Sequence, residues 1–133
     1  MKITHLPILP LFSSLMATLS AEVTFSAKAD YFTIGLKDIG EITASASAVF
    51  SSGGKNYRMG TRDLSLRGEV KTAEVVTPFG RASQTDRLYG KDGSPFQLTL
   101  RIKELNDIHA ITIQGFLHNR SDQDLSLHSL EIL

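Results

Sequence analysis

The chain has 133 residues, a length that fits one domain. It carries 14 Lys and Arg against 14 Asp and Glu, so neither a basic surface for nucleic acid nor an acidic disordered tail is indicated. The absence of Cys excludes disulfides, thiolate zinc sites and cysteine nucleophiles, and the absence of Trp disfavours a surface for stacking nucleotide bases.

Residues 1–21 differ in composition from the rest of the chain. Lys2 is followed by an apolar stretch and then by small residues, and no acidic residue comes before Glu22. This is the layout of a secretory signal peptide. The apolar stretch is too short and too interrupted by Pro to span a membrane, and the same prolines disfavour the alternative of a buried N-terminal helix. The sequence therefore predicts export, to the periplasm or outside the cell, with 22–133 as the mature domain.

Alternation of apolar and polar side chains begins at Glu22 and predicts β-strands. The expected strands in this half cover 22–29, 31–37, 41–51 and 56–59, the last two forming a hairpin. Adjacent glycines in the turn at 51–56 favour that hairpin, because glycine readily takes positive φ. Ala44, Ala46 and Ala48 share one face of their strand, and such small side chains predict close approach of another layer.

The middle of the chain is less regular. Residues 63–76 alternate with phase breaks near Gly68 and Ala73, which predict bulges or a strand change. Pro and Gly are frequent in 77–95, so this segment is predicted to be mostly connection with a short strand at 86–89.

The last third predicts a three-stranded meander of 96–105, 108–118 and 125–133. Both faces of the second strand are apolar, which indicates a central position, and the third slips in phase at His128–Ser129, which suggests a bulge. No window shows a helical period, so the predicted fold is an all-β antiparallel sandwich. The sequence ends on an apolar residue of a strand-like run, so we expect that the domain is truncated at its C-terminus.

The stretch HNRSDQDL at 118–125 concentrates polar side chains between two apolar runs. A calcium loop could use Asn119, Asp122 and Asp124, but the central Gly and distal Glu of an EF-hand-like loop are missing. Asn, Asp and Ser favour turns because their side chains bond to nearby backbone, so a turn is predicted. Asn119 also begins an Asn-Arg-Ser sequon, which a turn would expose.

Three histidines follow the N-terminal segment: His109, His118 and His128. In the predicted meander, His118 and His128 lie roughly 10 Å apart along adjacent strands, too far to share a metal. No G-x-S-x-G elbow supports a Ser-His-Asp triad. The strand glutamates Glu69, Glu74 and Glu104 show no spacing that pairs them across a cleft, as glycoside cleavage would require. No catalytic residue, metal ligand or cofactor site is predicted.

A carbohydrate-binding face needs exposed aromatic side chains that stack on sugar rings. The candidates for such contact are Tyr31, Tyr57 and Tyr89. The alternative interpretation places all three at the edge of the hydrophobic core.

Three motifs carry a family resemblance: TPFGRASQTDRLYG, then FQLTLRI, then IHAITIQGFLHNRSDQDLSLHSLEIL. This order is similar to the N-terminal β-supersandwich domain of bacterial α-galactosidase-like enzymes, the group that includes melibiases and raffinose synthases. Pro-Phe-Gly at 78–80, Asn119-x-Ser121-Asp122 and Leu125-x-Leu127 carry the likeness. It covers 70–133, with a looser likeness over 22–69.

The resemblance implies that the whole protein hydrolyses or transfers terminal α-galactosyl groups. The catalytic Asp pair would lie in a (β/α)₈ barrel beyond residue 133, so this chain alone is predicted to be inactive. Its partner would be that C-terminal catalytic domain, docked on an exposed apolar face at 44–48 or 125–133. The alternatives are a stand-alone immunoglobulin-like module for carbohydrate binding or adhesion, and a self-contained small enzyme.

Overall fold

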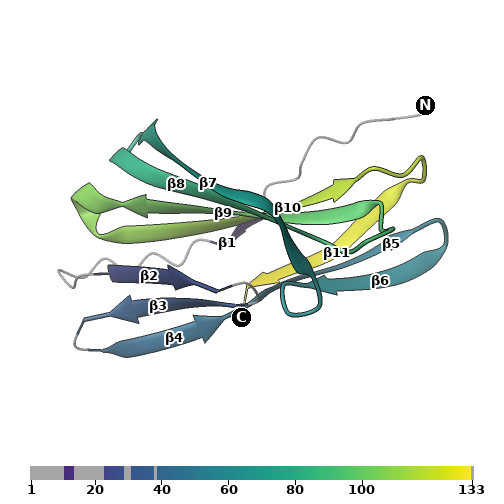
Figure 1. Cartoon of the computed structure of the whole chain (residues 1–133), viewed down its shortest axis with the longest axis horizontal. Coiled ribbons are helices and arrows are strands. Elements are labelled where there is room, and N and C mark those ends of the chain that lie inside the picture. The colour runs from purple at the N-terminus through teal and green to yellow at the C-terminus, as the bar shows by residue number, and fades with distance from the viewer. Residues whose placement is uncertain (1–10, 14–22, 29–30, 38, 133) are drawn as a thin grey trace.

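The computed structural model describes residues 11–13, 23–28, 31–37 and 39–132, which form an antiparallel β-sandwich of two layers (Figure 1). The all-β fold predicted from the sequence is confirmed. The strands are β1 (Leu11–Ser13), β2 (Val23–Ala27), β3 (Phe32–Leu36), β4 (Gly40–Ala44), β5 (Ala46–Ser52), β6 (Lys55–Gly60), β7 (Ser65–Thr77), β8 (Gly80–Gly90), β9 (Phe96–Leu105), β10 (Ala110–Asn119) and β11 (Leu125–Ile132). A single 3₁₀ turn among the described residues, η1 (Asn106–Ile108), joins β9 to β10.

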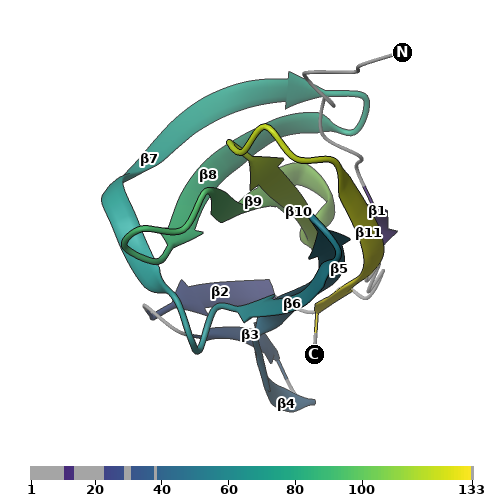
Figure 2. The ribbon, with the colours of Figure 1, turned by 90° about the vertical axis from the view of Figure 1, so that its right-hand side faces the viewer.

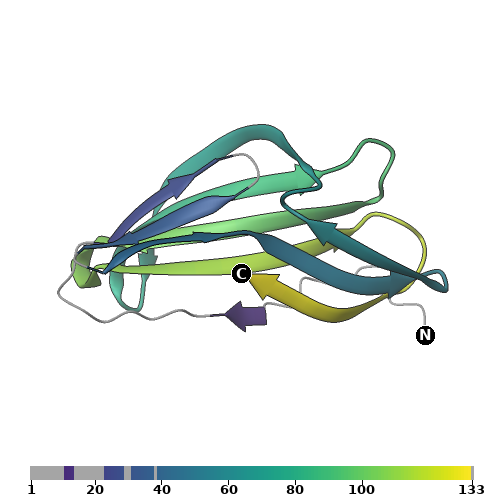
Figure 3. The same cartoon turned by 90° about the horizontal axis from the view of Figure 1, so that it is seen from below.

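One layer is a five-stranded sheet in the order β1-β10-β9-β8-β7. The other layer contains two three-stranded sheets, β2-β3-β4 and β11-β5-β6, which lie end to end beneath the large sheet in Figure 1. Figure 3, from below, shows β4 running on into β5. Only Ser45 separates these two strands, so the expected single strand at 41–51 is divided between two sheets.

The main core lies between the layers and follows from the alternation in β9. Leu98, Leu100 and Ile102 are at most 1% exposed and face Phe32 and Ala46 of the second layer within one cluster. Each fully buried side chain of this kind contributes about 1.5–3 kcal/mol to folding. Ala44 and Ala46 are buried in this core and Ala48 in the second cluster, as predicted from their small side chains, because the row lies against the large sheet.

A second core cluster fills the other end of the sandwich with aromatic rings. Phe50 stacks on Tyr57 with ring centroids 5.2 Å apart, and Phe96 meets Phe50 edge-on at 4.8 Å. Stacked and edge-to-face pairs each add about 0.5–1.5 kcal/mol beyond the area that they bury. This cluster joins β5 and β6 to β9 across the two layers.

The predicted three-stranded meander is wrong in its last strand. β9 and β10 pair as expected, but β11 pairs with β5 in the opposite layer. The connection between Asn119 and Leu125 therefore crosses from one layer to the other. This crossing lets the apolar side chains of β11 cover the core from the second layer. No local pattern in the sequence specifies which layer β11 joins.

The prediction that 77–95 is mostly connection with a short strand at 86–89 is also wrong, because β8 is continuous over eleven residues. Its start is a tight turn in which the Thr77 hydroxyl donates to the Gly80 carbonyl at 2.8 Å and accepts from the Phe79 amide at 3.1 Å. Gly80 takes a φ of +105° there. Pro and Gly thus mark the ends of β8, while its polar middle lies within the sheet.

Two predicted bulges are confirmed and one is not. The register of β7 against β8 shifts between Arg67 and Lys71, around Gly68, and that of β11 against β5 shifts between Leu127 and Ser129. From Lys71 onward the β7–β8 register is unbroken, so no bulge lies at Ala73. The predicted signal peptide at 1–21, called the leader from here on, is described only at residues 11–13, which form β1. Leu133 lies outside the described residues.

Candidate functional site

Five side chains from three adjacent strands meet on the outer face of the large sheet. We call this group the outer patch: Asp86, Thr99, Arg101, Phe116 and His118. The register explains the grouping, because Arg101 pairs with Asp86 in β8 and Thr99 pairs with Phe116 in β10. Alternation along β9 directs Thr99 and Arg101 away from the core that Leu98 and Leu100 fill.

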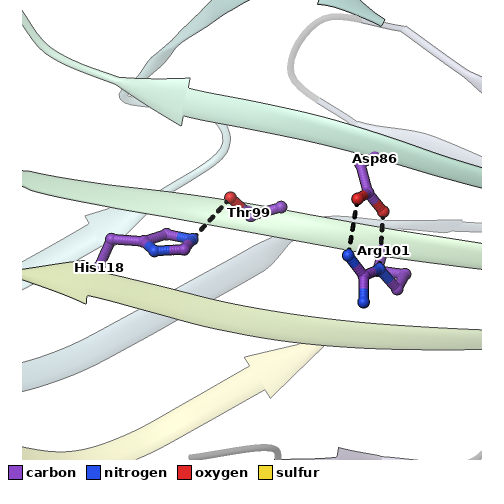
Figure 4. A network of polar contacts seen from close by, with 4 residues as sticks. All are labelled: Asp86, Thr99, Arg101 and His118. Carbon is purple, nitrogen blue, oxygen red and sulfur yellow. Dashed lines mark hydrogen bonds and ion pairs between the residues drawn. The ribbon is translucent and has the colours of Figure 1, made fainter. Parts of the chain in front are cut away.

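The strongest contact in the outer patch joins Arg101 and Asp86 (Figure 4). The Arg101 Nε and Nη2 atoms donate to the two carboxylate oxygens of Asp86, each at 2.8 Å. The bond to Asp86 raises the pKa of Arg101 above its usual value. The Arg101 guanidinium also lies 5.2 Å from the centroid of the Phe116 ring, within reach of a cation–π interaction.

His118 contacts Thr99 in the same patch, with 2.9 Å between the Nε2 and Oγ1 atoms (Figure 4). Burial lowers the pKa of His118 below its usual value, and the positive charge of Arg120 lowers it further. Both effects favour the neutral imidazole. Asp86 is bonded to Arg101 and not to His118, so these residues do not form a hydroxyl-histidine-carboxylate triad.

The three histidines are spread over the sandwich. His109 follows η1 with a φ of +49°, His118 lies near the opposite end of β10, and His128 contacts Ser51 at 3.2 Å in the other layer. Within the described residues, no group of three His, Asp or Glu side chains is placed to hold a metal ion.

The tyrosines predicted to contact carbohydrate do not share a surface. Tyr89 is 2% exposed, and its hydroxyl accepts a hydrogen bond from Arg87 Nε at 3.1 Å, so its ring has no free face. Tyr57 packs within the aromatic cluster of the core. Tyr31 is half-buried at the other end of the second layer, where the Lys28 ammonium lies 5.3 Å from its ring centroid. Carbohydrate contact by Tyr31 or Tyr57 stays a prediction.

The stretch at 118–125 contains the predicted turn. The Asn119 side chain donates to the Gln123 carbonyl at 2.7 Å and accepts from the Ser121 amide at 2.9 Å, as expected of Asn in a turn. This turn and the β5–β6 turn border an open hollow of about 390 Å³. Its lining is Ser51, Ser52, Gly53, Gly54, Gln123, Asp124, Leu125 and Ser126.

Exposed apolar side chains gather at two places that the sequence did not indicate. Ile39 and Ile42 lie on the β3–β4 hairpin, where only Ala44 of β4 is buried. Val70, Val76 and Phe79 lie along β7 and its turn into β8, and Val76 is 87% exposed. The prediction of an exposed docking face at 44–48 is wrong, because Ala44, Ala46 and Ala48 are buried against the large sheet.

Comparisons with protein-family models, with curated proteins and with solved structures each found no match. In the part of the chain that the structure describes, no helix has the length and apolar character to cross a membrane.

Proposed function

We propose that this chain is the N-terminal, non-catalytic β-sandwich of an exported α-galactosidase-like glycoside hydrolase. In this role it supports a catalytic barrel located elsewhere in the polypeptide. The observation that carries the proposal is the exposure of two apolar side chains close together in sequence, Val76 at the end of β7 and Phe79 in its turn into β8. Exposed apolar side chains grouped in this way are characteristic of surfaces that pack against another domain. The resemblance of residues 70–133 to the family's sandwich domain supports the same assignment.

The β7 edge is suited to docking because its apolar side chains add little to the core of the sandwich. Val76 and Phe79 are 87% and 55% exposed, so burying them against a second domain would remove their apolar surface from water. Neither side chain belongs to the three core clusters that the described residues form. The bulge around Gly68 bends this strand, and Figure 2 shows β7 curving away from the smaller sheets.

The test begins with the coding DNA beyond codon 133. We expect an open frame that encodes strand-helix repeats with Asp at strand ends, and an encoded protein that releases nitrophenol from 4-nitrophenyl α-galactoside. The 133-residue chain alone should be inactive in the same assay. An immediate stop codon, or a downstream domain without this activity, would overturn the proposal.

The docking surface is tested in the longer protein with the double variant Val76→Ser, Phe79→Ser. We expect a lower thermal midpoint there and an unchanged midpoint in the isolated chain, because both side chains are exposed in the sandwich. Glu74→Ser, an exposed position on the same strand, is the matched control. Equal midpoints for all variants of the longer protein would place the domain contact elsewhere.

A second candidate function is carbohydrate binding by an immunoglobulin-like module, favoured by the hollow at the β5–β6 turn. Its volume of about 390 Å³ suits a small ligand, and hydroxyl, amide and carboxylate groups line it. The Ser52 hydroxyl is buried without a hydrogen-bond partner among the described residues. A glycan panel screened by amide chemical shifts tests this function. We expect shifts at Gly53, Gly54 and Gln123 that Gln123→Ala abolishes, and a panel without shifts would remove the candidate.

A further inference from the structure

The outer edge of β10 is paired over part of its length by a strand from the predicted leader. Leu11 pairs with Gly115, Phe12 with Gln114 and Ser13 with Ile113, in antiparallel register. β10 has ten residues and β1 only three, so most of this edge has no other strand beside it within the described structure. If the leader is cleaved, the main-chain groups of Ile113–Gly115 that face β1 lose their partners.

The same strand lies where the two layers meet. β1 contacts β11 as well as β10, and β11 is the edge strand of its own sheet. Figure 2 shows β1 beside β11. Gly115 lets the layers approach here, because a Cβ atom at that position would lie 2.5 Å from the Leu130 Cδ2 atom. We call this region the β10–β11 seam, defined by residues 113–115 and 127–132.

The two sides of the large sheet, β7 and β10, differ in their charged side chains and bulges. Edge strands that do not pair with a further strand are protected from strand pairing by charged side chains and bulges. β7, the opposite edge, carries Arg67, Glu69, Lys71 and Glu74 together with the bulge at Gly68. β10 has the sequence AITIQGFLHN, without Asp, Glu, Lys, Arg or Pro, and its register against β9 is unbroken. The β10 edge therefore has the features of a strand that is normally covered.

We propose that the outer edge of β10, at the β10–β11 seam, is a strand-acceptor site for an extended apolar segment of a partner polypeptide. Leu11–Ser13 fills the site in the full chain, and the partner strand fills it once the predicted leader has been removed. Main-chain hydrogen bonds to residues 113–115 supply the affinity, and contact with β11 selects apolar side chains. The seated segment Leu-Phe-Ser is neutral, which matches a seam where Glu131 is the only formally charged residue among 113–115 and 127–132.

The test uses the full chain with Phe12→Pro, which removes a main-chain donor from β1, and Phe12→Ala as the control that keeps it. Hydrogen exchange is followed at the amides of Ile113, Gln114 and Gly115. We expect the proline variant, but not the alanine variant, to exchange about tenfold faster or more at the amides that face β1. Adding a peptide of residues 9–16 should restore protection, whereas the same peptide with proline in place of Phe12 should not.

A second form of the experiment covers the case in which Phe12→Pro does not fold. A protease site replaces residues 14–21 of the full chain, the protein is folded and then nicked, and a labelled 9–16 peptide is offered. Exchange of the released N-terminal fragment for the labelled peptide supports the proposal. Failure of the peptide to bind in both forms would overturn it. Dimers of the opened chain that the peptide does not dissociate would also overturn it, since the occupant would then be a second copy.

Discussion

At the scale of single residues, the outer patch shows how neighbouring strands create contacts that no short motif contains. Arg101 meets Asp86 because β8 and β9 place them opposite each other, fifteen residues apart in sequence. The pair is about one-third exposed on both sides, at 34% and 35%, so water weakens it. Its bidentate geometry nevertheless fixes the guanidinium above the Phe116 ring.

Removing the charge of Asp86 tests the value of this pair. We expect Asp86→Asn to lower the free energy of unfolding by about 0.5–1 kcal/mol at low salt, and by less at high salt, because the pair is partly exposed. Urea unfolding at two salt concentrations measures this. Asp92→Asn is the control, since Asp92 bonds to Arg67 but its side chain is 95% exposed, and it should leave stability unchanged. Equal effects of the two variants would contradict this prediction.

His118 gives the fold a dependence on pH. Because its pKa is lowered on folding, the unfolded chain binds more protons than the folded chain below the usual value of about 6.5. The contribution of His118 to the free energy of unfolding is therefore fully present above pH 6.5 and is lost as the pH falls through the lowered pKa. Relative to His118→Gln, we expect the stability of the natural chain to rise between pH 5 and 7.5, as measured by urea unfolding. His128→Gln is the matched control, and a flat difference for His118→Gln would refute the assignment.

At the scale of elements, the two sides of the large sheet differ in what prevents pairing with further strands. The β7 edge combines a bulge with alternating charges, whereas β10 relies on a neighbouring strand. Gly68 occupies the bulge with a φ of +68°, a conformation that side chains with a Cβ atom adopt at a cost.

Gly68→Ala should therefore destabilise the sandwich by about 1 kcal/mol or more through backbone strain alone. No atom lies within 4 Å of the position that its Cβ would take, so a clash makes no contribution. Glu69→Ala, at the next and also exposed position, should have little effect. Chemical denaturation of both variants measures the difference, and similar midpoints would show that the bulge tolerates a side chain.

The alanine row fixes the spacing between the layers. Ala48 is fully buried, so Ala48→Leu should cost about 1–3 kcal/mol by overpacking the core. Ser47→Leu adds a similar volume on the opposite face of β5 and should be tolerated. Thermal unfolding compares the midpoints of the two variants. An equal decrease in both would mean that either face of β5 is intolerant of a large side chain, so the spacing of the layers would not explain the effect.

At the scale of the whole molecule, two small sheets share one large sheet as their covering layer. Phe32 and Ile34 of the β2-β3-β4 sheet pack in the same cluster as Leu98, Leu100 and Ile102. The β11-β5-β6 sheet packs on the other end of β9 through Phe96. Because β9 belongs to both cores, neither small sheet has a core that is independent of the other.

We therefore expect the described domain to unfold in a single transition. Ile34→Ala removes a side chain that is 8% exposed and should cost about 2–5 kcal/mol. Amides in β5, in the other small sheet, should then lose protection at the same urea concentration as amides in β3. Retained protection in β5 after β3 has opened would show two separately folding halves.

Local sequence patterns were enough to predict the all-β class, the alternation of β9, the turns at Gly53–Gly54 and Asn119–Ser121, and the bulge at Gly68. These features depend on neighbouring residues, because side-chain period, positive φ and short polar side chains act within a few positions. Leu98 and Leu100 could be assigned to a core before any partner strand was known.

Long-range packing, and not local patterns, sets which strands are neighbours and therefore where the candidate sites lie. β11 pairs with β5 and not with β10, β8 runs unbroken through a polar stretch, and Tyr89 is buried. Strand order depends on burial and pairing between segments far apart in the chain, which local patterns do not encode. The Arg101–Asp86 contact and the β10–β11 seam follow from that order, because each combines residues from different strands. Val76 and Phe79 are exposed because no other strand covers the outer side of β7 in the described structure.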